Sequence, residues 1–235
     1  MNQLETPLSD QQVKTKSAAE AQRDERREDI LSAAENCFIQ YGFHGTTMQV
    51  VAKAAGMSPG NLYRYFPSKN AIVEGLVERD RDEARRRFAC LDRSLSFWEQ
   101  LAQIGNQYFV GEAQSKAALC IEIWAESTRN PEIDAINRPF EGEVAAQLVE
   151  MLDSARARGE VAADIDSAAA AQMILVITNG LYVRAGLRRD NDGADQFQCA
   201  MQAIYGLLSG APVLRRAGDK LESHAQQCTP QNPSL

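Results

Sequence analysis

Residues 42–69 read GFHGTTMQVVAKAAGMSPGNLYRYFPSK and carry the start and stop signals of two short helices. The paired threonines supply hydroxyl N-caps for a first helix, which Gly56 ends. Ser58 followed by Pro59 opens a second helix, because a capping hydroxyl and a proline at the first helical position both favour helix starts. Two short helices joined by a tight turn that contains glycine predict a helix-turn-helix arrangement.

A third helix precedes this pair. Apolar residues recur at helical spacing from Ile30 through Phe38 to Tyr41, and Gly42 follows at the expected C-terminal position. After the pair, Ser68 caps a longer helix that extends to about residue 91. The three helices before it form a compact unit. This unit can act as a rigid support for the last of the three helices, residues 58–66.

The last helix of the unit divides its side chains between core and solvent. Leu62 and Phe66 lie four residues apart and can bury against Val51, Ala55 and Phe38. The residues left facing outward suit DNA, because they combine base-edge hydrogen bonding, phosphate contact and close backbone approach: Pro59, Gly60, Asn61, Tyr63 and Arg64, flanked by Tyr65 and Lys69. For Tyr63 or Tyr65 taken alone, the alternative to DNA contact is a position in the core.

The rest of the chain predicts an all-α fold. Helical patterns cover residues 96–112, 116–128, 131–158, 167–188 and 194–209, and no alternating strand pattern occurs. We expect a polar, mobile lead at 1–22, a helix-turn-helix domain at 23–69, a helical ligand-binding and dimerisation domain at 70–211, and a loose tail at 212–235.

The formal net charge of -7 argues against a nucleic-acid binder until it is divided along the chain. Residues 1–70 contain eight basic and eight acidic groups, so the whole excess of acid belongs to residues 71–235. Residues 36–70 contain Lys53, Arg64 and Lys69 and no acid. The sequence therefore predicts a small cationic surface on an acidic protein, with salt-sensitive DNA binding.

Other classes of protein find no support in the sequence. The two histidines, His44 and His224, are poorly placed for catalysis, and no nucleophile, phosphate-loop or zinc-protease motif occurs, so we expect neither an enzyme nor a cofactor or metal site. Five scattered cysteines do not form a disulfide framework and indicate a reducing cytoplasm. The apolar stretch at 168–183 is short and interrupted by polar residues, so we expect a buried helix and no membrane span.

The stretch from Gly42 to Ala52, continued from Ala55 to Lys69, resembles the DNA-binding domain of TetR-type transcriptional regulators in both order and spacing. The resemblance covers residues 26–75. It implies DNA contacts by Thr46 or Thr47, Ser58, Gly60, Asn61, Tyr63, Arg64, Tyr65 and Lys69. Pro59 stands where many relatives have lysine, so one cationic contact is missing.

The resemblance also implies a homodimer that pairs through its last two long helices. Residues 168–183 are apolar on nearly all sides, and Ile204, Leu207 and Leu208 give the last helix an apolar stripe. Paired recognition helices would read DNA half-sites about one helical turn, roughly 34 Å, apart. The alternative is that both helices are internal core.

The resemblance further implies that the central helices enclose a cavity for a small effector. The candidate ligand-binding residues are apolar or aromatic: Phe97, Trp98, Leu101, Tyr108, Cys120, Ile123, Trp124, Phe140, Leu148 and Met151. Plain core packing is the alternative for each of them. Glu122 and Glu126 could attract a cationic ligand if they faced inward, or could form a solvated face.

These observations together predict a ligand-responsive transcriptional repressor that a small, largely apolar or aromatic molecule releases from a palindromic operator. The helix that begins at Ser68 connects the DNA unit to the ligand unit, so its tilt would transmit the signal. The alternative is a protein of the same shape that binds DNA architecturally, or binds a protein partner, without regulating a promoter.

Overall fold

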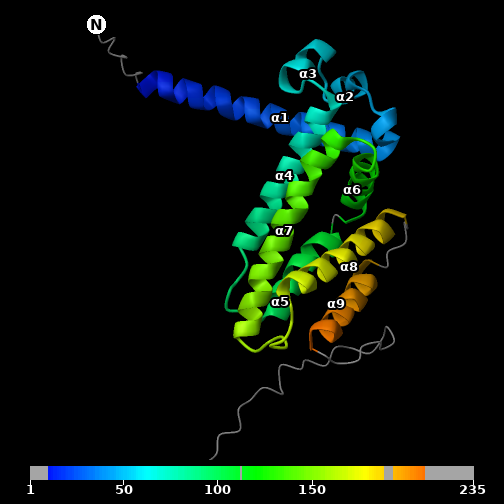
Figure 1. Cartoon of the computed structure of the whole chain (residues 1–235). Helices are drawn as coiled ribbons and strands as arrows, with labels where there is room; N and C mark the ends of the chain where they lie inside the picture. Colours follow the sequence, from blue (N-terminus) through cyan, green and yellow to red (C-terminus); the bar gives the residue numbers. More distant parts are fainter. Residues whose placement is uncertain (1–9, 112, 188–192, 210–235) are drawn as a thin grey trace, which may run out of the picture.

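The computed structural model describes residues 10–111, 113–187 and 193–209. In this part of the chain all regular structure is helical, which confirms the predicted all-α fold (Figure 1). The helices are α1 (Asp10–Gly45), α2 (Met48–Ala54), α3 (Pro59–Tyr65), α4 (Lys69–Ala89), α5 (Phe97–Asn106), a π-helical turn (Gln107–Gly111), α6 (Ala113–Ser127), α7 (Pro131–Ala157), α8 (Ser167–Leu187) and α9 (Gly193–Ser209). The predicted tail at 212–235 lies outside the described residues.

The caps that set the first helices are those predicted from the sequence. The hydroxyls of Thr47, Ser58 and Ser68 accept hydrogen bonds from the backbone N–H groups three residues further on, at the starts of α2, α3 and α4. Gly42 and Gly56 adopt φ values of 71° and 64°, in the left-handed region that glycine tolerates without strain. These short-range signals decide where the chain turns.

The N-terminal prediction was wrong in one respect. Residues 10–22 were expected to be an unstructured lead, but α1 begins at Asp10 and runs as one long rod, kinked only at Gly42, beneath α2 and α3 (Figure 1). The stretch AAEAQRDERRED at 18–29 has no apolar period but consists largely of strong helix formers, and Arg26 and Asp29 form an ion pair three residues apart. Intrinsic helix propensity therefore extends α1 toward its N-terminus, where the sequence has no apolar period to pack against the core.

The core of the helix-turn-helix unit continues into the helices below it. Leu62, fully buried, and Phe66 pack with Phe38 and Val51 as predicted. The same cluster includes Leu119, Ile123 and Ile133, which belong to α6 and α7. The DNA-binding unit is thus joined to the rest of the chain by shared apolar packing as well as by α4.

The helices α4 and α7 lie side by side, and α8 packs across α6 and α7 with α9 beside it (Figure 1). Among the described helices, α8 alone is long and apolar enough to cross a membrane, by length and composition only, yet just 17% of its apolar stretch is buried. The prediction of a buried helix at 168–183 therefore fails for the single chain.

Large apolar side chains are exposed mainly on these two last helices. Of the seven that the described part exposes, five lie on α8 or α9: Met173, Val176, Val183, Leu187 and Leu207. Single exposed apolar residues are ordinary, but a contiguous set marks an interaction surface.

Candidate DNA-binding surface and ligand cavity

The exposed face of α3 carries the residues predicted to contact DNA. Pro59, Gly60, Tyr63 and Arg64 are exposed, and nearly half of the Tyr63 surface is accessible, at 47%. Ser58 caps the helix on the solvent side. A Cβ at position 60 would meet nothing within 4 Å, so the backbone there is open to close approach by a duplex. Asn61 and Tyr65 are half-buried at the edge of this face.

Thr46 does not belong to this surface. Its residue surface is 1% exposed, and its Oγ1 lies 3.0 Å from the Cys37 carbonyl oxygen and 2.9 Å from that of Gly42. A hydroxyl held inside the α1–α2 turn cannot reach DNA without opening the turn. Thr47, by contrast, is exposed and caps α2.

Lys69 has an internal role instead of the predicted position beside a phosphate. Its Nζ donates hydrogen bonds to the carbonyl oxygens of Phe43 (2.6 Å) and Thr46 (3.2 Å), and lies 3.9 Å from the centre of the Phe43 ring. Burial lowers the pKa of the Lys69 ammonium, although the Glu126 charge opposes this. The residue ties the start of α4 to the turn that precedes α2.

A polar groove of about 620 Å³ separates α1 from α3. Its α1 side is lined by Gln22, Arg23, Glu25, Arg26 and Asp29, and its α3 side by Asn61, Arg64 and Tyr65. Arg26 also donates to the Ala55 carbonyl oxygen at 3.2 Å, which fixes α1 against the end of α2. Sequence reasoning missed the two α1 arginines, because a helix without an apolar stripe gives no indication of what lies beside it.

Two carboxylates of α6 hold the corner between α1 and α2. A Glu122 oxygen accepts a hydrogen bond from the Phe43 N–H at 2.8 Å, and a Glu126 oxygen lies 3.0 Å from His44 Nε2. Glu126 is 4% exposed and also accepts from Arg129. Neither predicted interpretation, a cationic ligand site or a solvated face, describes these residues. They attach α6 to the DNA-binding unit.

A cavity of about 180 Å³ lies among α4, α5, α6, α7, α8 and α9, below the DNA-binding unit. Seven of the ten predicted ligand-binding residues line it: Leu101, Tyr108, Cys120, Ile123, Trp124, Phe140 and Leu148. Phe109 and Tyr182, which were not predicted, add to the aromatic wall, with ring centres 5.0 Å apart.

Phe97, Trp98 and Met151 do not line this cavity. Phe97 and Met151 are buried in the core at the far end of the bundle, and Trp98 packs between Phe97 and Tyr205. For these three, plain core packing is the correct interpretation. Helical spacing alone cannot distinguish an apolar side chain that faces a cavity from one that faces a neighbour.

One end of the cavity is polar, and no sequence signal marked it. Asp80 and Glu83 from α4 and Lys116 from α6 line this end, and Lys116 Nζ donates to Glu83 at 2.7 Å. Burial raises the pKa of Asp80, although Lys116 and Arg79 oppose the shift. Burial also raises the pKa of the Cys120 thiol to about 12, and the Asp80 charge adds to this.

Burial likewise favours a raised pKa for Glu83, but hydrogen bonds and charge from Lys116 and Arg87 outweigh it and hold the pKa of Glu83 below its ordinary value. The described residues contain no cluster of three or more side chains able to hold a metal ion.

A capped recognition helix with an exposed polar face, set on a helical body that encloses a cavity, defines a DNA-binding regulator. Two family descriptions match the chain: residues 30–76 match "Bacterial regulatory proteins, tetR family", and residues 98–208 match "BetI-type transcriptional repressor, C-terminal". The chain belongs to the TetR family of helix-turn-helix transcriptional regulators, which are not enzymes.

Individual relatives agree. The regulator UidR of Escherichia coli (strain K12) is 30% identical over 152 residues, which is 65% of this chain and 77% of UidR. RutR of the same strain is 45% identical over 67 residues, or 28% of this chain and 32% of RutR. The structure of Salmonella enterica GusR aligns with a TM-score of 0.68 at 32% identity and covers 79% of this chain and 94% of GusR.

The internal position of Lys69 gives a first prediction. Lys69→Met should lower the free energy of unfolding by about 1–3 kcal/mol, because two carbonyl groups lose a charged donor. The slope of log affinity for DNA against log salt should stay that of wild type, since no phosphate contact is lost. Chemical denaturation and salt-dependent anisotropy measure the two quantities, and Lys53→Met on the exposed surface of α2 is the control for stability. A salt slope reduced by about one at unchanged stability would restore Lys69 to the DNA surface.

Proposed function

We propose that the protein is a dimeric cytoplasmic repressor that leaves a palindromic operator when a small, largely apolar or aromatic molecule enters the cavity. One observation carries the proposal. The helix α6 lines the cavity through Cys120, Ile123 and Trp124, and residues interleaved with these, Glu122 and Glu126, bind the α1–α2 corner. A molecule that moves the cavity wall therefore acts on the helix that holds the DNA-binding unit.

The DNA surface in this proposal consists of the exposed face of α3 and the groove beside it. Tyr63 and Arg64 reach base edges and flanking phosphates, with Asn61 and the N-terminus of α3 near the backbone. Arg23 lines the same groove as Arg64, so it would add a phosphate contact from α1. The lysine that many relatives have in place of Pro59 is thereby offset by a cation from another helix.

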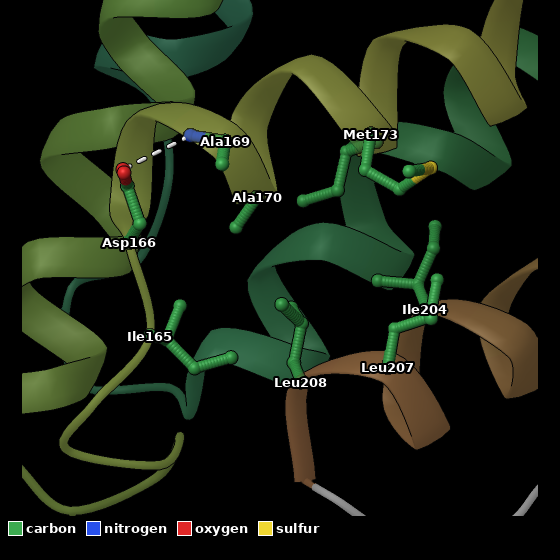
Figure 2. Close-up of a pocket in the computed structure, with 9 residues that line it drawn as sticks. Ile165, Asp166, Ala169, Ala170, Met173, Ile204, Leu207 and Leu208 are labelled. Carbon is green, nitrogen blue, oxygen red and sulfur yellow. Dashed lines mark hydrogen bonds between the residues drawn. The ribbon is translucent and has the colours of Figure 1, made fainter.

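The exposed apolar faces of α8 and α9 support a homodimer. Between the first half of α8 and the second half of α9 lies an apolar depression of about 210 Å³, with Met173 and Leu207 at its edge (Figure 2). Asp166 caps this end of α8 by accepting hydrogen bonds from the N–H groups of Ala168 and Ala169. A second copy of the chain would bury both faces and fill the depression, as two-fold packing of two helices per subunit does.

The proposed signal passes through two connections. The helix α4 begins at the Ser68 cap beside the recognition helix and reaches the cavity at Val77 and Asp80. The helix α6 reaches the α1–α2 corner through Glu122. A ligand that favours one arrangement of these helices by about 1–3 kcal/mol would weaken operator binding roughly 5–150-fold.

The direct test of operator recognition is selection of bound DNA from a random pool. The selected sequences should be palindromes, and Arg64→Ala and Tyr63→Ala should each cost about 1–3 kcal/mol of operator affinity in anisotropy titrations. Glu150→Ala, an exposed acid on α7, is the control and should leave affinity unchanged. Dispersed, non-palindromic sequences would favour the architectural alternative, and wild-type affinity in both α3 variants would contradict the recognition face.

The dimer has its own test. Val176 is 65% exposed on α8, so Val176→Glu should leave each chain folded but place a charge in the apolar interface. We expect a monomer in analytical ultracentrifugation, together with at least a hundredfold loss of operator affinity because one recognition helix makes too few contacts. Ala157→Glu, at the exposed end of α7, should remain dimeric. A dimeric Val176→Glu would exclude this face of α8.

The α6 connection is tested by Glu122→Ala, with Glu122→Gln as the conservative variant. Loss of the acceptor for the Phe43 N–H should reduce ligand-induced release of DNA at least threefold while ligand affinity without DNA stays within twofold of wild type. Glutamine keeps an acceptor oxygen and should restore most of the response. If both variants release DNA like wild type, α6 does not carry the signal.

A further inference from the structure

Asp80 presents an unsatisfied acceptor at the polar end of the cavity. Its side chain belongs to α4 and lines the cavity, and its Oδ1 is buried without a hydrogen-bond partner. A buried polar atom without a partner costs free energy, because the hydrogen bonds it made to water in the unfolded chain are not replaced. The Asp80 side chain as a whole keeps 25% of its surface accessible and lines the cavity, so a ligand donor can reach this carboxylate.

The cations around Asp80 are held by other carboxylates. Lys116 Nζ donates to Glu83 at 2.7 Å and lies 4.0 Å from Asp80 Oδ1, beyond hydrogen-bond distance. Arg79 binds Glu35 of α1. The charges of Lys116 and Arg79 moderate the field at Asp80, but neither residue donates a hydrogen bond to Oδ1.

The remaining wall is largely apolar or aromatic, with Asn137, Glu141, Thr178 and Asn179 as further polar side chains. Trp124 and Tyr182 meet edge to face with ring centres 6.1 Å apart, and Phe109 stands 5.0 Å from Tyr182. Such rings accept a flat apolar body, and their negative faces also tolerate a nearby cation. The aromatic residues therefore suit the flat apolar body of a ligand, and the Asp80 carboxylate suits its polar end.

We propose that the effector carries a hydrogen-bond donor, a hydroxyl or an ammonium group, on a flat aromatic body, and that the Asp80 carboxylate accepts from this donor while Trp124 and Tyr182 enclose the body. This inference rests on the proposed ligand-responsive function and names its ligand class. Molecules whose polar end is a carboxylate should bind more weakly, because their charge would meet those of Asp80 and Glu83, with Lys116 alone among the described cations in the cavity wall to offset it.

Four probes with one aromatic body test the inference: 1-naphthylmethylamine, 1-naphthalenemethanol, 1-methylnaphthalene and 1-naphthoate. Affinity for the full-length protein is measured by isothermal calorimetry, with thermal shift as a second readout and without DNA. We expect the amine and the alcohol to bind at least tenfold more tightly than 1-methylnaphthalene, and 1-naphthoate to bind more weakly than all three. Asp80→Asn keeps the shape of the side chain and should remove most of the preference for the amine.

The matched control is Asp82→Asn, an exposed aspartate two residues further along α4, which should bind all four probes like wild type. A variant that fails to fold is recognised by its melting curve, and Asp80→Ser, smaller and uncharged, then replaces Asp80→Asn. Equal binding of 1-naphthoate and the amine, an unchanged preference in the Asp80 variant, or no binding by any probe would overturn the inference. Binding through Asp80 without release of operator DNA would leave it standing and would contradict the proposed repressor mechanism instead.

Discussion

The hydrogen bond from the Phe43 N–H to the Glu122 carboxylate connects the DNA-binding unit to helix α6 of the body below it. It forms at the corner where Gly42 turns the chain through a left-handed conformation, and a Cβ at Gly42 would lie 3.3 Å from a Glu122 oxygen. On the other side of the same corner, the Lys69 ammonium binds the carbonyl oxygens of Phe43 and Thr46. The corner is thereby held from α6 and from α4, and the position of the recognition helix depends on both.

Much of this architecture follows from local signals in the sequence. The hydroxyl caps at Thr47, Ser58 and Ser68 and the glycine at 56 act over three or four residues, so they can be recognised without the fold. The inner and outer faces of α3 were predicted for the same reason, since Leu62 and Phe66 already occupy the helical positions that face the core. The N-terminal extension of α1 was not predicted, because helix propensity without an apolar period gives no sign of a packing partner.

Long-range contacts account for the errors. Thr46, Lys69 and Glu122 have the residue types of DNA or ligand contacts, but each has its polar atoms engaged by groups that lie apart in sequence or inside a turn. The pattern likewise could not separate the aromatic residues that face the cavity from Phe97 and Trp98 in the core, because both have helical spacing. The composition of α8 correctly indicated an apolar helix. The predicted burial of that helix was wrong, because its apolar surface faces outward from the single chain.

The position of Asp80 adds a physical reason why one small molecule could move the DNA-binding unit. Asp80 lies on α4, twelve residues or roughly 18 Å of helix beyond the Ser68 cap, whereas Trp124 lies on α6 two residues beyond Glu122. A ligand that donates to Asp80 and packs on Trp124 bridges the two helices that hold the corner. Because a ligand shifts an equilibrium only by its differential affinity for the two states, a molecule that touches both attachments can distinguish their relative positions. An apolar molecule without the donor contacts α4 only through apolar residues such as Val77 and senses that difference less.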